Sequence, residues 1–236
     1  MKDALRELAI ANRILAREGV VDAFGHVSIR HPERPDRYFM ARSRSPELVT
    51  VDDLMEFSLE GTPIDARGRT AYSERFIHAA IYEARADVIS VIHNHSHAII
   101  PYGITPVNLR PVLHVAAAIG EEIPVWDIAK KFGDTNMLVV NMEQGRDLAA
   151  TLGANRVALM RGHGCALAGR TLREAVFTAV YLQVNAELQT RALMLSDDVR
   201  YLSPGEAAKA KEMTSQPIGL ERAWEYWSMR ADRTGL

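Results

Sequence analysis

The 236-residue sequence has a single cysteine, Cys165, and almost no excess charge of either sign. A lone thiol cannot form a disulfide within the chain, which excludes a disulfide-built secreted scaffold and favours a reducing compartment. The 28 Lys and Arg residues nearly balance the 30 Asp and Glu residues, so the formal net charge is −2. Such a balance argues against nucleic acid or a membrane surface as a partner. We therefore expect a cytoplasmic protein that binds neither.

Long hydrophobic runs that could cross a membrane are missing as well. Residues 88–109 contain no Asp, Glu, Lys or Arg, but they include three histidines and two prolines. Polar groups of this kind are costly in hydrocarbon. We therefore expect no membrane-spanning helix, and the missing charges in this segment need another explanation.

Hydrophobic periodicity predicts an α/β protein with irregular alternation of helices and short strands. Helical spacing covers residues 3–18, 73–85 with Ser73 as a cap, 143–152 and 172–195. Strand-like segments cover residues 26–30, 37–41, 55–59, 88–92, 137–140 and 157–160. Several strands follow one another near the start, so a mixed or antiparallel sheet flanked by helices fits better than a doubly wound parallel sheet.

The chain is predicted to form one large domain followed by a C-terminal extension. We place a catalytic domain at residues 1–198 and the extension at residues 199–236. Residues 199–217 have a loop-like composition, and the tail beyond them contains Trp224, Tyr226 and Trp227. Large aromatic side chains favour buried contacts. We expect this tail to pack on its own domain or on a neighbouring subunit.

A cluster of histidines follows the predicted strand at residues 88–92. In an extended chain, alternate side chains point to the same face, so His93 and His95 can offer two imidazoles to one metal ion. His97 lies beyond them on that face if the strand continues. A His-x-His pair alone fits equally well with two core histidines that are hydrogen-bonded to nearby backbone. Local sequence leaves both interpretations open.

Glycines flank another histidine in the segment Gly162-His163-Gly164, directly after the predicted strand at residues 157–160. Glycine permits unusual backbone angles and close approach, so this histidine either supplies a third imidazole or lies in a tight turn by chance. Cys165 is a rival ligand, but we leave it out because a free cysteine is more often a small buried hydrophobe. Glu74 begins the predicted helix at 73–85. If it faces the histidines, it is a fourth ligand or a base.

Several short motifs together resemble the class II aldolase/adducin family over roughly residues 5–195. They occur in the family's order: Gly25-His26-Val27-Ser28, Ser73-Glu74, Tyr82-Glu83-Ala84-Arg85-Ala86-Asp87, His93-Asn94-His95-Ser96 and Gly162-His163-Gly164. The resemblance implies a class II aldolase-like α/β/α sandwich with a central, largely antiparallel mixed sheet. It also implies a homotetramer or a dimer of tetramers, with a divalent metal in active sites between subunits.

The resemblance also assigns roles to four residues of this sequence. His93, His95 and His163 match the family's metal histidines, and Glu74 matches its acid/base glutamate, which we also count as a metal ligand. We expect Mn²⁺ or Zn²⁺, with Fe²⁺ or Co²⁺ as further candidates, because all four ions accept such ligands.

The sequence departs from the sugar-phosphate aldolases of the family where those enzymes bind phosphate. It has a histidine, an arginine between two serines, and a Tyr-Ser pair at the corresponding places. Because arginine pairs with carboxylates through two parallel hydrogen bonds, we expect a small-molecule carboxylate as substrate. The residues predicted to bind it are His26, Ser43, Arg44, Ser45 and Ser73. These departures resemble the branch that contains 3-hydroxy-2-methylpyridine-4,5-dicarboxylate decarboxylase and dihydroxyphthalate decarboxylases.

We therefore predict a metal-dependent decarboxylase that acts on a hydroxylated aromatic or pyridine (di)carboxylate, with the metal as electron sink. One alternative is a class II aldolase or epimerase that acts on a small sugar or hydroxy-acid. A second is a non-catalytic assembly domain like that of adducin. His31 and His78 are interpreted as surface or structural residues, and His114 is left ambiguous.

Overall fold

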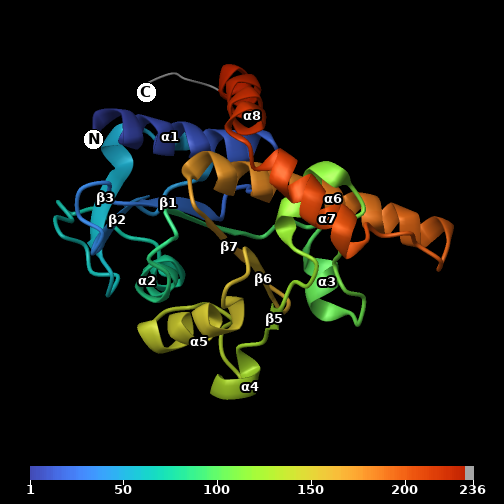
Figure 1. The fold of residues 1–236 in the computed structure, drawn as a ribbon. Coiled ribbons are helices and arrows are strands. Elements are labelled where there is room, and N and C mark those ends of the chain that lie inside the picture. Colours follow the sequence, from blue (N-terminus) through green and yellow to red (C-terminus); the bar gives the residue numbers. More distant parts are fainter. Residues whose placement is uncertain (232–236) are drawn as a thin grey trace.

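The computed structural model describes residues 1–231, and within them seven strands form one sheet that has helices on both faces (Figure 1). The strands lie in the order β3-β2-β1-β4-β7-β6-β5. Their bounds are β1 His26–Arg30, β2 Arg37–Ala41, β3 Leu54–Ser58, β4 Ser90–Asn94, β5 Val125–Trp126, β6 Val157–Met160 and β7 Gly164–Gly169. All neighbours are antiparallel except β5 and β6, which pair in parallel. The predicted α/β/α sandwich with a largely antiparallel mixed sheet is confirmed.

Two hydrophobic cores lie on the two faces of the sheet. One core contains side chains of α1 (Lys2–Arg17), α6 (Leu172–Leu195) and α8 (Pro217–Arg230), and the other contains side chains of α2 (Arg75–Ala84) and α5 (Met142–Leu152). Figure 1 shows α1, α6 and α8 on one side of the strands, with α2 and α5 on the opposite side. The remaining helices are α3 Ile100–Ile104, α4 Ala129–Phe132 and α7 Pro204–Thr214, together with the 3-10 turns η1 Pro46–Leu48, η2 Val51–Asp53 and η3 His114–Ile119.

Three local predictions are wrong. Residues 137–140 form no strand, because the Val139 backbone N–H bonds the Glu74 carboxylate rather than a neighbouring strand. Ser73 does not cap α2, whose N-cap position is Glu74 and has no side-chain cap. Residues 199–217 are not a continuous loop, since α7 begins there with a capping box between Ser203 and Glu206.

The C-terminal helix α8 packs against α1 and α6. Its Trp224 and Trp227 are buried, and the Trp227 ring lies 6.1 Å from the rings of both Phe177 and Tyr181 on α6. Within residues 1–231, no helix is both long and apolar enough to cross a bilayer. The described part of the C-terminal extension therefore adds to the core on the α1 and α6 side of the sheet.

The contact between α2 and α5 depends on Gly145. A Cβ atom at this position would lie 2.5 Å from the Phe76 carbonyl oxygen. Alanine is favoured over glycine by about 1 kcal/mol in a helix interior, but this overlap with backbone outweighs the gain. We expect Gly145→Ala to lower the free energy of unfolding by about 1–3 kcal/mol, as measured by urea denaturation.

Gly205→Ala in α7 is the matched control, because within residues 1–231 the added Cβ would meet nothing within 4 Å beyond the adjacent residues and the backbone of its own helix. We expect this variant to match the parent or to gain up to about 1 kcal/mol. Equal stability of the two variants would contradict the close α2–α5 contact.

Candidate metal centre

Four side chains from separate parts of the chain converge at one edge of the sheet. His93 belongs to β4 and His95 follows that strand directly. His163 lies in the turn between β6 and β7, and Glu74 occupies the N-cap position of α2. Their ligand atoms all lie within 4.8 Å of one another. The structure thus brings together the four residues that the sequence singled out.

The ring nitrogens in this cluster are very close. The Nε2 atom of His95 lies 2.9 Å from Nε2 of His93 and 3.0 Å from Nε2 of His163. The Oε2 atom of Glu74 lies 3.5 Å from Nε2 of His93 and 3.6 Å from Nε2 of His163. Three imidazole nitrogens and one carboxylate oxygen therefore point at the same small space.

The donor set fits a divalent cation. Nδ1 of His93 lies 2.9 Å from the Cys165 carbonyl oxygen, so it must carry the ring proton and Nε2 is left with a free lone pair. Such a backbone partner on the far nitrogen is typical of metal-binding histidines. Three imidazoles and a carboxylate suit Zn²⁺, Mn²⁺, Fe²⁺ or Co²⁺. Glu74, His93, His95 and His163 could hold such an ion.

Glycine allows β7 to approach β4 at the centre. A Cβ atom on Gly164 would lie only 2.0 Å from the carbonyl oxygen of Asn94, so no larger residue fits at this position. Gly162 has a φ angle of +64°, a conformation that residues with a Cβ seldom adopt. These two backbone requirements explain the glycines around His163 and place its ring beside His95.

Burial and neighbouring imidazoles act in opposite directions on Glu74. Burial raises the pKa of its carboxyl, but His93 and His163 outweigh burial and hold that pKa below its usual range. The Oε1 atom also accepts a hydrogen bond of 3.1 Å from the Val139 backbone N–H. Glu74 is therefore an ionised carboxylate with one oxygen anchored and the other facing the histidines.

Of the residues predicted to bind substrate, His26 lies next to this centre, and Arg44 is connected to it through two side chains, those of His26 and Tyr72. The His26 ring centroid lies 5.1 Å from that of His93 and 4.7 Å from that of Tyr72. The Tyr72 hydroxyl in turn donates to the Arg44 carbonyl oxygen. Tyr72 thus links the His26 ring to the segment that carries Arg44.

Arg44 and Arg42 bind the same carboxylate, that of Asp53. The Nη1 atom of Arg44 lies 2.9 Å from Oδ2 of Asp53, and Nε of Arg42 lies 2.7 Å from Oδ1 of the same carboxylate. Burial raises the pKa of Asp53, but hydrogen bonds from Thr50, Arg42 and Arg44 lower it to about 2. One buried carboxylate therefore holds two arginines, and the group as a whole carries a net positive charge.

The three serines predicted to bind substrate lie at the margin of this group. Ser43 and Ser73 are exposed, and Ser45 is half-buried before η1 without a capping side-chain bond. His31 is buried, and its Nδ1 atom accepts backbone N–H bonds from Glu33 and Arg34, which fits the predicted structural role. His114 is exposed.

Sequence reasoning missed Asp53 and undervalued His78. His78 is fully buried, and its Nε2 atom lies 2.7 Å from Nδ1 of His26. Burial is the main reason that the pKa of His78 falls to about 3 and that the pKa of His26 also lies well below its usual value. The spacing of His78 from Glu74, four residues along α2, is the signal that could have revealed it.

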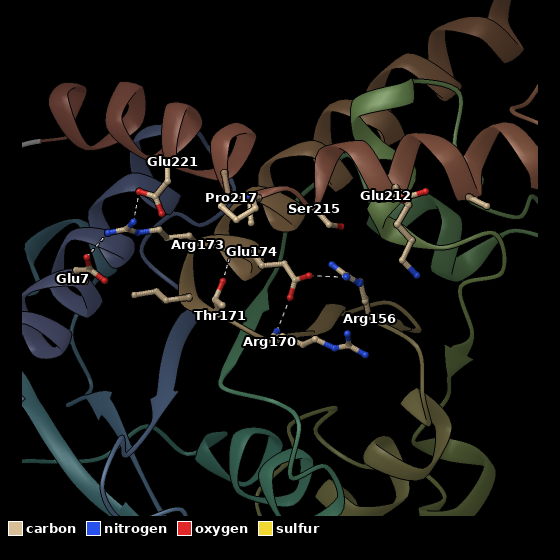
Figure 2. A pocket seen from close by; sticks show the side chains of 14 residues that line it. Glu7, Arg156, Arg170, Thr171, Arg173, Glu174, Glu212, Ser215, Pro217 and Glu221 are labelled. Carbon is tan, nitrogen blue, oxygen red and sulfur yellow. Dashed lines mark hydrogen bonds and ion pairs between the residues drawn. The ribbon is translucent and has the colours of Figure 1, made fainter.

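A cavity of about 790 Å³ lies between the start of α6 and the C-terminal helices, away from the histidine cluster (Figure 2). Its acidic and basic side chains largely neutralise each other: Arg173 pairs with Glu7 and Glu221, and Arg156 pairs with Glu174. None of the four converging residues lines it. We therefore place the chemistry at the histidine cluster.

A family model described as the Class II Aldolase and Adducin N-terminal domain matches residues 6–190. The chain belongs to the class II aldolase and adducin family, as its motifs predicted. A decarboxylase of Talaromyces stipitatus, named tropJ, is 35% identical over 94% of this chain and 92% of its own length. The 3,4-dihydroxyphthalate decarboxylase of Arthrobacter keyseri is 22% identical over 94% of this chain and 92% of its own length.

Solved structures agree on the fold. An aldolase II superfamily protein from Pseudomonas syringae superposes with a TM-score of 0.81 at 21% identity, covering 99% of this chain and 93% of that protein. The predicted resemblance to the decarboxylase branch is likewise confirmed by the curated relatives.

The cluster predicts cation binding that can be measured without a substrate. We expect the purified protein to bind about one Zn²⁺ per chain in isothermal titration calorimetry. His95→Ala should weaken that binding by more than about 100-fold, because even changes to residues behind the ligands cost 10–100-fold. His97→Ala is the matched control, since this exposed histidine lies two residues further on and outside the cluster. Equal affinities for the two variants would contradict the site.

Proposed function

We propose that the protein is a divalent-metal-dependent decarboxylase that acts on a hydroxylated aromatic or pyridine (di)carboxylate. The observation that carries this proposal is the convergence of Glu74 and three histidines, which His26 and Tyr72 connect to the segment that carries Arg44. A cation site and an arginine together suit a substrate with more than one anionic oxygen. The two curated relatives reported above bear names of decarboxylases, which supports the same reaction type.

Loss of CO₂ from an aromatic ring breaks a carbon–carbon bond and leaves an electron pair on the ring carbon. A divalent cation bound by the four residues would supply Lewis-acid stabilisation for that charge. The protein's own contribution is to orient the ring, to exclude water and to replace the departing carboxyl group by a proton. Arg44 and His26 are assigned to orienting the ring, and Glu74 is assigned to transferring the proton.

Glu74 is placed to carry the proton. As an ionised carboxylate it can take the proton of the substrate's ring hydroxyl through Oε2 and deliver it to the ring carbon that bears the carboxylate. CO₂ then leaves, and the electron pair of the broken bond restores the aromatic ring. The proton count balances, because one proton leaves the hydroxyl and one arrives at carbon. The hydrogen bond from Val139 holds Oε1, so Oε2 is the oxygen left for this exchange.

Arg44 is placed to bind the substrate's second carboxylate. Asp53 fixes one side of the guanidinium, and about a third of the Arg44 side chain remains exposed, with a relative accessibility of 34%. A fixed arginine orients a planar substrate better than a mobile one, because less conformational entropy is lost on binding. His26 lies on the same side and adds a second polar contact.

The choice between Mn²⁺ and Zn²⁺ stays a prediction, because the four ligands suit both ions. The homotetramer that the family resemblance implies also stays a prediction. Size-exclusion chromatography with light scattering measures the assembly directly.

Release of CO₂ tests the proposed reaction. We expect the metal-loaded protein to release CO₂ from 3,4-dihydroxyphthalate or from a hydroxypyridine dicarboxylate. Glu74→Gln, assayed at saturating metal, should lower kcat by about 10²–10⁴-fold because an amide cannot exchange the proton. The midpoint of its urea unfolding curve should stay close to that of the parent protein. Release of CO₂ from none of these compounds, together with an aldehyde product from a sugar acid, would favour the aldolase alternative.

Removal of the Arg44 guanidinium tests the carboxylate site. We expect Arg44→Ala to raise KM about tenfold or more, with a smaller change in kcat, because a charge-assisted hydrogen bond is lost. Arg42→Ala is the matched control, since Arg42 binds the same Asp53 carboxylate. Its KM should change less. Unchanged kinetic parameters for Arg44→Ala would show that the substrate carboxylate binds elsewhere.

A further inference from the structure

A row of buried polar side chains continues from the metal centre along α2. Glu74, His78 and Tyr82 are spaced four residues apart, so they lie along one face of that helix. This face meets β1, where His26 and Ser28 alternate to the same side of the strand. Each of the five has a relative accessibility of 6% or less. Only Glu74 and His26 belong to the site described so far.

Three short contacts join four of these side chains into a chain. Nδ1 of His26 lies 2.7 Å from Nε2 of His78, and Nδ1 of His78 lies 2.6 Å from Oγ of Ser28. Oγ of Ser28 then lies 2.7 Å from the Tyr82 hydroxyl. Every link is within hydrogen-bond distance, so each must contain one proton.

Counting protons leaves two arrangements. Two neutral imidazoles and two hydroxyls carry four protons, whereas three contacts use only three of them. Ser28 could also accept from both neighbours and direct its own proton elsewhere, but within residues 1–231 its Oγ atom has no further hydrogen-bond partner. The fourth proton therefore lies at one end of the chain. It is either on the Tyr82 hydroxyl and directed away from Ser28, or on Nε2 of His26 and directed away from His78.

The Tyr82 end decides between the two arrangements. Away from Ser28, the acceptor within reach of the phenol is the Ile89 carbonyl at 3.4 Å, which is too long for a good O–H···O bond. That carbonyl already accepts the Arg30 backbone N–H at 2.8 Å. The phenol proton therefore belongs in the 2.7 Å contact with Ser28.

This choice fixes every other proton in the row. Tyr82 donates to Ser28, Ser28 donates to Nδ1 of His78, and Nε2–H of His78 donates to Nδ1 of His26. His26 must then carry its own proton on Nε2. No other residue in the described part of the chain is recorded as a hydrogen-bond partner of that nitrogen.

We propose that Tyr82, Ser28 and His78 are positioning residues that hold His26 as a neutral Nε2–H donor toward a carboxylate oxygen of the substrate. The proposal rests on the decarboxylase function argued above, which supplies the carboxylate. In the opposite arrangement His26 would offer a lone pair and would repel that carboxylate. The buried row thus determines that His26 presents a hydrogen-bond donor, rather than an acceptor, to the substrate.

The tautomers can be measured directly in the intact protein. In ¹⁵N spectra of histidine-labelled protein loaded with Zn²⁺, we expect both His26 and His78 to carry their proton on Nε2. The spectrum of His26→Gln assigns the His26 signals. A proton on Nδ1 of either ring, or a doubly protonated ring, would overturn the proposal. Because this measurement needs no turnover, it holds even if the protein decarboxylates none of the compounds tested.

Kinetic measurements distinguish a positioning role of Ser28 from a contribution to stability alone. Ser28→Ala removes the donor to His78, so we expect a mixture of His26 tautomers and a KM about 3–10-fold higher, with a smaller change in kcat. Ser90→Ala is the matched control, because Ser90 is equally buried and its hydroxyl donates to the Ser28 carbonyl oxygen rather than to a member of the row's side-chain contacts. It should leave the tautomers and KM unchanged.

His26→Gln tests the donor itself. A glutamine amide still offers an N–H near the position of Nε2, whereas His26→Leu offers none, so the leucine variant should have the higher KM by about tenfold or more. Equal KM values for these two variants would overturn the proposal, and so would identical behaviour of Ser28→Ala and Ser90→Ala.

Discussion

The close approach of β7 to β4 is the constraint on which the site depends. With no Cβ at Gly164, the backbone of β7 reaches the Asn94 carbonyl, and the turn before it carries His163 to within 3.0 Å of His95. Any side chain at Gly164 would push the strand away and separate the third imidazole from the other two. The same pairing places the Cys165 carbonyl against Nδ1 of His93, which fixes the proton of that ring. Backbone packing, rather than the histidines themselves, therefore sets the geometry of the donor atoms.

Much of this arrangement could be predicted because local patterns determine it. Strands β1, β2 and β6 and helix α6 begin and end where periodicity placed them. The convergence of Glu74 with the three histidines was predicted only through family resemblance, since each motif alone had an ordinary structural explanation. The convergence of these four side chains depends on the order of the strands in the sheet. Local patterns do not reveal that order, because the neighbouring strands β4 and β7 are separated by about seventy residues of sequence.

Two of the errors, at His78 and at residues 137–140, arose because the contacts that decide these structures come from partners distant in sequence. His78 lies beside the apolar stripe of α2 and was therefore given little weight. It is buried because α2 is covered by the sheet on one side and by α5 on the other. Residues 137–140 have the composition of a strand but serve to hold Glu74 through Val139. In α7 the capping box at Ser203 and Glu206 was a local signal, yet the polar composition of this segment hid it.

The row from His26 to Tyr82 shows how burial and polarity constrain each other. A buried polar group without a partner costs about 1–3 kcal/mol, so each member of the row is tolerable only while its neighbours are present. That mutual dependence also removes freedom, because reversing one hydrogen bond requires reversing all three. The end at Tyr82 lies inside the protein and has a poor alternative acceptor, whereas the end at His26 faces the candidate site. The direction of all three hydrogen bonds is therefore determined by Tyr82 in the core, and it decides which form His26 presents where a substrate would bind. A residue far from the reacting atoms can thus determine which ligand charge the site accepts.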